Sequence, residues 1–104
     1  MKLLTKEIQK KLPPLYTNEN KSPEDTKIIV KFFCPWGKWT WYATEWDQED
    51  RFYGYIVGDF PELGYFSLRE LESVRGPFGL KIERDLYYGY DHTLAEVMTK
   101  AVAL

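Results

Sequence analysis

The sequence predicts an α+β fold in which an antiparallel sheet of three to five strands packs with an N-terminal helix, a capped helix near residues 67–75 and a C-terminal helix. Three observations predict it. Residues 28–66 contain short runs that alternate with a period of two and are separated by tight turns. Leu4, Ile8 and Leu12 recur at helical spacing. Two capping-box patterns, Ser67 with Glu70 and Thr93 with Glu96, mark the starts of helices.

The length and the cysteine count fit a single domain over residues 1–104. A chain of 104 residues can bury a usable core without covalent staples. One cysteine excludes an internal disulfide and fits a reducing compartment. The sequence shows no secretory signal and no apolar run long enough to cross a membrane, so we expect a cytoplasmic location with no membrane partner.

The N-terminal helix is expected over residues 3–12, with Thr5 as its N-cap. Pro13 and Pro14 should end it, because proline lacks the backbone N–H and restricts the residue before it. Leu15 and Tyr16 are expected to enter the core, and residues 17–25 to form a polar loop.

The centre of the chain reads as a hairpin of residues 28–33 and 39–46, joined by a turn at residues 34–37, and it holds all four tryptophans. In the second strand, strict alternation places Trp39, Trp41 and Ala43 on one face and Thr40, Tyr42, Thr44 and Trp46 on the other. Large rings therefore occur on both faces. Either helices cover both faces, which is the favoured interpretation, or one face is an exposed aromatic surface.

A third strand is expected over residues 51–57 and a fourth over residues 63–66. Gly54 inside the third strand predicts a bulge or a close approach of another segment. Gly76 and Pro77 should end the helix that Ser67 opens. Residues 79–84 could form a short fifth strand or an extended segment, and the last helix should run to about residue 103.

Charge is unevenly distributed along the chain. Residues 1–31 contain seven lysines and four acidic residues, a net charge of +3, whereas residues 44–72 contain eight acidic residues and two arginines, a net charge of −6. Such asymmetry can steer a charged partner. It argues against a general nucleic-acid-binding protein, which needs a basic stripe. The alternative is that the acidic residues are only solvated turns and helix faces.

No motif in the sequence indicates a cofactor or a metal ion, and none is expected. Cys34 and His92 lie far apart in the sequence, so a Cys–His nucleophile has little support. A second candidate cluster combines charges around a Gly-Pro loop, where arginines could pair with acids as a brace or as a binding site. Its members are Glu45, Glu70, Glu72, Arg75, Glu83, Arg84 and Asp85.

Several strings together resemble a bacterial family, the domain of unknown function 2958. They are Pro13-Pro14-Leu15-Tyr16, Val30-Lys31-Phe32-Phe33, the run from Trp39 to Glu45, the run from Glu62 to Ser67, the run from Glu70 to Pro77, and Ile82-Glu83-Arg84-Asp85. The resemblance covers about residues 3–86. It implies a small single-domain protein often carried on plasmids, integrative elements and phages, and it implies no established activity or catalytic residue.

These observations favour a non-catalytic accessory protein of a mobile genetic element that binds a basic protein partner through an acidic, aromatic surface. The residues expected to form that surface are Trp36, Trp46, Asp47, Glu49, Asp50 and Tyr53, with all three rings exposed. One alternative is a single-stranded nucleic-acid-binding module with rings stacked on bases, which the charge disfavours. Another is a small enzyme with Glu45, Glu70 and Arg75 in a cleft.

Overall fold

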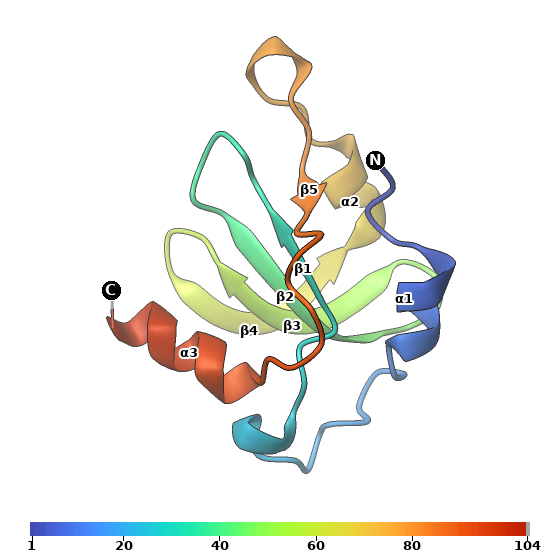
Figure 1. The fold of residues 1–104 in the computed structure, drawn as a ribbon, viewed down its shortest axis with the longest axis vertical. Coiled ribbons are helices and arrows are strands. Elements are labelled where there is room, and N and C mark those ends of the chain that lie inside the picture. Colours follow the sequence, from blue (N-terminus) through green and yellow to red (C-terminus); the bar gives the residue numbers. More distant parts are fainter. Residues whose placement is uncertain (104) are drawn as a thin grey trace.

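A computed structural model of the chain describes residues 1–103, with the side chains of residues 1–100. It shows an α+β fold (Figure 1), as the sequence predicts. The elements, in chain order, are α1 (Lys6–Lys11), η1 (Pro23–Asp25), β1 (Val30–Phe33), β2 (Thr40–Trp46), β3 (Arg51–Val57), β4 (Pro61–Ser67), α2 (Leu68–Ser73), η2 (Pro77–Gly79), β5 (Glu83–Arg84) and α3 (Leu94–Ala103).

The strands form one antiparallel sheet in the order β4-β3-β2-β1-β5. Strands β1 to β4 are joined by short turns, so neighbours in sequence pair with each other. The chain then passes through α2 and returns to place β5 beside β1, where Phe32 lies opposite Arg84. The prediction of three to five antiparallel strands is confirmed, and residues 83–84 supply the fifth.

Helices lie on both sides of the sheet, which confirms the favoured interpretation of the central hairpin. On the α1 face, α1 and α2 pack over a core that contains Ile8, Phe32, Phe52, Phe66 and Leu71. On the α3 face, Leu94 and Val97 of α3 pack against Ile28 and Tyr55. Buried rings therefore occur on both faces of the sheet, although Trp39 is 40% exposed.

A β-bulge near the end of β2 changes which side chains face which layer. Ala43 lies opposite Gly54 and Glu45 lies opposite Tyr53, so Thr44 is an extra residue with no partner of its own. Beyond the bulge, the alternation is shifted by one residue. Trp46 therefore lies on the α1 face, and the prediction that it shares a face with Tyr42 is wrong.

Gly54 of β3 lies opposite the bulge in β2, and the sequence predicts a bulge or a close approach at this glycine. A Cβ atom at this position would lie 1.8 Å from the carbonyl oxygen of Tyr42. No side chain fits there, and the absence of one lets β2 and β3 approach closely at the bulge.

The N-terminal segment follows most of the predictions. Thr5 caps α1 by accepting a hydrogen bond from the Ile8 N–H at 3.2 Å. Leu4, Ile8 and Leu12 are buried on the α1 face. Tyr16, expected in the core, is instead 64% exposed and has a φ of 72°. The backbone turns outward at Tyr16, and its N–H points to the side chain of Glu45.

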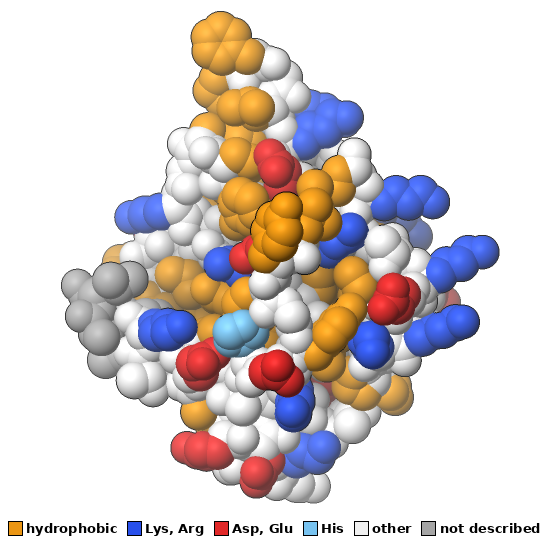
Figure 2. All heavy atoms as spheres, in the orientation of Figure 1, with side chains coloured by type: hydrophobic (Ala, Val, Ile, Leu, Met, Phe, Trp, Pro, Cys, Tyr) orange, Lys and Arg blue, Asp and Glu red, His pale blue; other side chains and the backbone are white. Residues whose placement is uncertain are grey.

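The loop after α2 projects away from the body of the molecule (Figure 1) and ends in the fully exposed ring of Phe78. The Gly76 N–H donates to the Leu80 carbonyl at 2.7 Å and closes the loop at its base. The Trp36 ring lies 2.5 Å from the position of a Cβ at Gly76, so this ring packs directly on the loop's backbone. Hydrophobic side chains gather at the tip (Figure 2).

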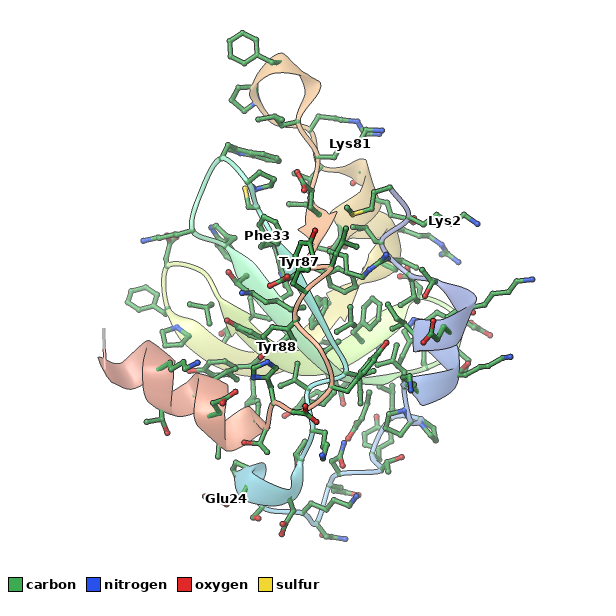
Figure 3. All side chains as sticks on the ribbon, viewed as in Figure 1. Lys2, Glu24, Phe33, Lys81, Tyr87 and Tyr88 are labelled. Carbon is green, nitrogen blue, oxygen red and sulfur yellow. The ribbon has the colours of Figure 1, made fainter. Side chains whose placement is uncertain are left out.

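Residues 85–92 cross the α3 face as an extended segment and lead into α3. Tyr87 and Tyr88 lie on this segment (Figure 3); Tyr87 is exposed, and Tyr88 is half-buried against Tyr42. His92 stacks on Tyr88 with ring centroids 4.0 Å apart and pairs with Glu96 at 2.5 Å. No helix within residues 1–103 is long and apolar enough to span a membrane.

Candidate functional site

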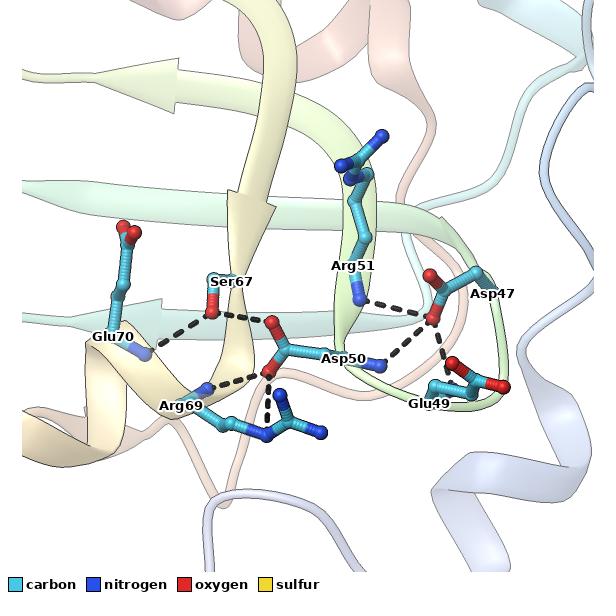
Figure 4. A network of polar contacts seen from close by, with 7 residues as sticks. All are labelled: Asp47, Glu49, Asp50, Arg51, Ser67, Arg69 and Glu70. Carbon is cyan, nitrogen blue, oxygen red and sulfur yellow. Dashed lines mark hydrogen bonds and ion pairs between the residues drawn. The ribbon is translucent and has the colours of Figure 1, made fainter.

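In the acidic turn between β2 and β3, the carboxylates of Asp47 and Asp50 accept hydrogen bonds from backbone N–H groups (Figure 4). Asp47 Oδ1 accepts hydrogen bonds from the N–H groups of Glu49, Asp50 and Arg51 at 2.9, 2.8 and 3.0 Å. Asp50 reaches the start of α2, where it accepts from the Ser67 hydroxyl at 2.6 Å and from the Arg69 N–H at 2.8 Å. Both side chains thus organise the local fold.

The pKa values of these two groups reflect the same contacts. Slight burial raises the pKa of the Asp47 carboxyl, but hydrogen bonds from the N–H groups of Asp50, Glu49 and Arg51 outweigh burial, and the pKa lies below its usual value. The hydrogen bond from Ser67, followed by that from the Arg69 N–H, lowers the pKa of Asp50. Both carboxylates are therefore ionised at neutral pH.

The residues expected to form one acidic, aromatic surface do not all lie on the surface. Trp46 is only 5% exposed and stacks on Phe52 at 5.9 Å, so the prediction that its ring is exposed is wrong. The bulge at Thr44 is the reason, because it turns Trp46 into the core. Trp36 is half-buried against that core and Tyr53 is half-buried on the α3 face. Among the three acids, Asp47 and Glu49 are exposed and Asp50 is half-buried, and no hydrogen bond of the Glu49 carboxylate is seen.

The second candidate cluster does not form the expected network of arginines and acids. Arg75 donates to the backbone carbonyls of Glu72 and Val74 at 2.7 and 2.9 Å. Arg84 donates to the backbone carbonyl of Lys2. Asp85 pairs with Lys31 at 3.5 Å. Each arginine therefore braces a chain segment through carbonyl oxygens, which a sequence pattern does not reveal.

The proposed enzyme cleft also lacks support in the geometry. Glu70 lies exposed on α2, which covers the α1 face, whereas the side chain of Glu45 is on the α3 face. Cys34 is buried in the core of the α1 face, away from His92 on the segment that leads into α3. Among the described residues, no group of three or more His, Cys, Asp or Glu side chains could hold a metal ion.

A pocket of about 310 Å³ lies on the α3 face. It lies where β2, β3 and β4 extend past α3, between the sheet and residues 16–26. We call it the Glu45 pocket. Its lining residues are Tyr16, Asn18, Glu19, Lys21, Pro23, Thr26, Thr44, Glu45, Tyr53, Leu63, Tyr65 and Leu94.

Glu45 belongs to the buried part of the lining, with an exposed fraction of 3%. Its Oε1 accepts the Tyr16 N–H and its Oε2 accepts the Asn18 N–H, each at 2.8 Å. Among the side chains that the structure describes, no lysine, arginine or histidine lies within ion-pair distance of this carboxylate. The pocket therefore contains a buried acid that is hydrogen-bonded but has no cation.

Tyrosine rings line the pocket above this acid. Tyr53 and Tyr65 are cross-strand neighbours with ring centroids 5.2 Å apart in an edge-to-face arrangement. Hydrogen bonding with the Tyr16 side chain, followed by burial, raises the pKa of Tyr65. Arg51 lies over the Tyr65 ring at 5.5 Å. Glu19 and Lys21 lie at the exposed rim.

A second pocket, of about 240 Å³, lies beside residues 84–90 and already contains a cation. The ammonium group of Lys31 lies 5.7 Å from the Tyr42 ring centroid and 5.4 Å from that of Tyr88, and it pairs with Asp85. Burial raises the pKa of Tyr88, whose hydroxyl is buried without a partner. The charges in this pocket are balanced within the chain.

The sequence pointed to Glu45 and Tyr53 but not to Tyr16, Asn18 or Tyr65. Strict alternation would place Glu45 on the same side as Ala43, within the core, where an acid is out of place. That conflict was the one available signal that the strand departs from regular alternation near Thr44. The contacts of Glu45 with Tyr16 and Asn18 join segments 27 and 29 residues apart, and no local pattern predicts them.

The fold and the Glu45 pocket together define a small α+β protein with a tyrosine-lined pocket that contains a buried acid. The chain belongs to a family described as "Protein of unknown function (DUF2958)", whose model matches residues 3–103. The match confirms the family resemblance and extends it through α3. Comparison with curated proteins and with solved structures finds no match.

Proposed function

We propose that this protein is a non-catalytic accessory protein that binds a basic protein partner through the Glu45 pocket and the tyrosines around it. The observation that carries the proposal is the buried Glu45 carboxylate, which faces a tyrosine-lined hollow and has no cation within ion-pair distance among the described side chains. The pocket thus combines the acidic and the aromatic character that the middle of the sequence shows.

The energetics favour a cationic ligand. A buried carboxylate loses hydration, and two N–H donors replace it only in part. A positive charge about 4 Å away gains roughly 4 kcal/mol at an effective dielectric constant of about 20. Aromatic rings attract a cation further through their π faces. Glu19 at the rim of the pocket would add to the attraction for a basic partner.

The acidic turn is a poorer contact surface than the pocket. Asp47 and Asp50 are engaged with backbone and with Ser67, so a partner would have to compete with those hydrogen bonds. Glu49 remains available. Within this proposal, the pocket supplies the contact, and the acidic turn takes no part in it.

Single-stranded nucleic acid fits the pocket less well. The Tyr53 and Tyr65 rings could stack on bases. However, Glu45 and Glu19 would repel the phosphates, with only Lys21 among the lining residues to offset them. The rings alone therefore do not favour this alternative.

The biological setting is part of the same proposal. The family resemblance supports an accessory role on a mobile genetic element, and a single buried cysteine suits work in the reducing cytoplasm. A protein of this kind would act on a host or element-encoded protein rather than on a metabolite.

The test is affinity capture from cells that carry the protein, with wild type beside Tyr65→Ala and Glu49→Gln. Tyr65 is half-exposed in the pocket wall, so its truncation alters the pocket with little effect on the core. We expect wild type and Glu49→Gln to retain the same basic protein and Tyr65→Ala to lose it. Retention should also weaken as salt rises. Equal retention by all three proteins, or a retained partner that is acidic, would overturn the proposal.

A further inference from the structure

We propose that the Glu45 pocket recognises the ammonium group of a single lysine side chain on the partner. This inference rests on the proposed function for the nature of the partner, but the chemical group follows from the pocket itself. The ammonium group would lie beside Glu45, and the methylene stem would run across the exposed surface of the Tyr53 and Tyr65 rings.

The protein contains a lysine held in this way elsewhere on the same face of the sheet. Lys31 places its ammonium group near the Tyr42 and Tyr88 rings, and Asp85 pairs with it at 3.5 Å. The Glu45 pocket repeats the arrangement of two tyrosines and one carboxylate with Tyr53, Tyr65 and Glu45. Arg51 already lies over the Tyr65 ring, but the Glu45 carboxylate has no cation beside it, and this is the place that a lysine would take.

Glu45 has the capacity to accept a further hydrogen bond. A carboxylate offers about four lone-pair sites, and the N–H groups of Tyr16 and Asn18 occupy two of them. An ammonium group needs only one free site on one oxygen. A guanidinium fork needs both oxygens in a parallel approach, and a separate backbone donor already orients each oxygen here. Lysine therefore fits this carboxylate better than arginine.

Size and rim charge agree with the assignment. A pocket of about 310 Å³ is at the small end of ligand pockets, which suits one side chain rather than a peptide segment. Lys21 lies on the rim without an ion-pair contact to Glu45. Its positive charge should repel the incoming ammonium group, so its removal should strengthen binding.

The experiment uses n-butylammonium chloride as the probe, because this ion reproduces the end of a lysine side chain. The ¹⁵N-labelled protein is titrated, and the amide shifts of Tyr16 and Asn18 are followed. We expect saturable shifts there with a millimolar dissociation constant. Equimolar n-butanol should bind at least about tenfold more weakly, since it lacks the charge. Binding of n-butylguanidinium should also be weaker.

Variants test the assigned roles. Glu45→Gln should weaken binding of n-butylammonium by about tenfold or more, and Lys21→Gln should strengthen it by about twofold. Glu49→Gln, which removes one equal charge outside the pocket, should leave binding unchanged. If Glu45→Gln fails to fold, Tyr65→Ala takes its place, with an expected loss of about tenfold.

Three outcomes would overturn the inference: butanol binding as well as butylammonium, shifts confined to the Lys31 region, or unchanged binding by a folded Glu45→Gln protein. Its failure can be told apart from failure of the proposed function. Partner capture without butylammonium binding overturns only the lysine assignment. Butylammonium binding without capture of a basic partner supports the site and overturns the proposed function.

Discussion

Two single residues, Glu45 and Gly54, have a large effect on the structure of the candidate site. The Gly54 position has no room for a side chain, and this close approach accompanies the bulge that places Glu45 on the α3 face. Glu45 in turn binds the backbone of Tyr16 and Asn18 and so positions the wall of the pocket. At the residue scale, a missing side chain and a buried acid together create the candidate site.

Gly54→Ala should destabilise the protein severely. The new Cβ would lie 1.8 Å from the Tyr42 carbonyl oxygen, which is backbone and cannot move aside without opening the sheet. We expect a loss of about 3 kcal/mol or more in the free energy of unfolding, measured in urea.

Gly64→Ala is the matched control, because Gly64 pairs with Gly54 across β3 and β4 and a Cβ there would meet only Ile56 Cδ1 at 4.0 Å. Its stability should change by less than about 1 kcal/mol. A Gly54→Ala protein as stable as Gly64→Ala would mean that the bulge is not as close-packed as described.

At the element scale, α2 begins with a cap shared between two segments. Ser67 accepts from the Glu70 N–H at 3.2 Å, as predicted, but it also donates to Asp50, which itself accepts from the Arg69 N–H. The six-residue helix is too short to be stable alone. The β2–β3 turn therefore stabilises the start of α2, and a change in one should be felt in the other.

Ser67→Ala and Asp50→Asn should each cost about 1 kcal/mol at pH 7, because each removes a capping contact. The double variant should lose less than the sum, with a coupling of at least about 0.5 kcal/mol. Urea unfolding of the four proteins measures this cycle. Strict additivity would show that the Ser67–Asp50 hydrogen bond adds nothing.

The Asp50 contribution should also depend on pH. Since the pKa of Asp50 is lowered in the folded protein, its stabilisation is present above the unfolded value, near about 3.9, and is lost as pH falls through the folded pKa. The difference in melting temperature between wild type and Asp50→Asn should therefore be full at pH 7 and shrink by pH 3.

At the scale of the whole molecule, sequence patterns predicted the helices and strands well, but they assigned the last residues of β2 to the wrong faces of the sheet. Alternation, turns and capping residues are local, and they located the four consecutive strands and the helices. Trp46 and Tyr16 were misplaced because a bulge and a buried Glu45 contact shift them, and both effects depend on distant segments. The pocket was only partly predicted, since its walls come together from residues 16–26, from the strands and from the first residue of α3.

Cys34 offers a probe of how the α1 face opens as a unit. Its thiol is buried in the core that joins α1, α2 and the sheet. We expect it to react with dithiobis(nitrobenzoate) at least about a hundredfold more slowly in the native protein than in urea, because reaction requires opening. A Lys10→Cys protein in a Cys34→Ser background should react at once, since Lys10 is exposed. Equally fast reaction of native Cys34 would show that this end of the hairpin opens by itself.

The number of residues in β2 decides which face of the sheet each of its side chains occupies, whereas the number of residues in a turn does not. Thr44 is the residue of β2 whose loss would keep the faces unchanged: Glu45 would then follow Ala43 directly, so Glu45 would stay on the α3 face and Trp46 on the α1 face. Loss of a residue from the regular part of β2 would instead exchange side chains between the two faces. A residue gained or lost in the exposed part of the next turn, at 59–60, would leave both faces as they are. We therefore expect insertions and deletions to be tolerated where each side chain of the sheet keeps its own face, and to disrupt the fold where it does not.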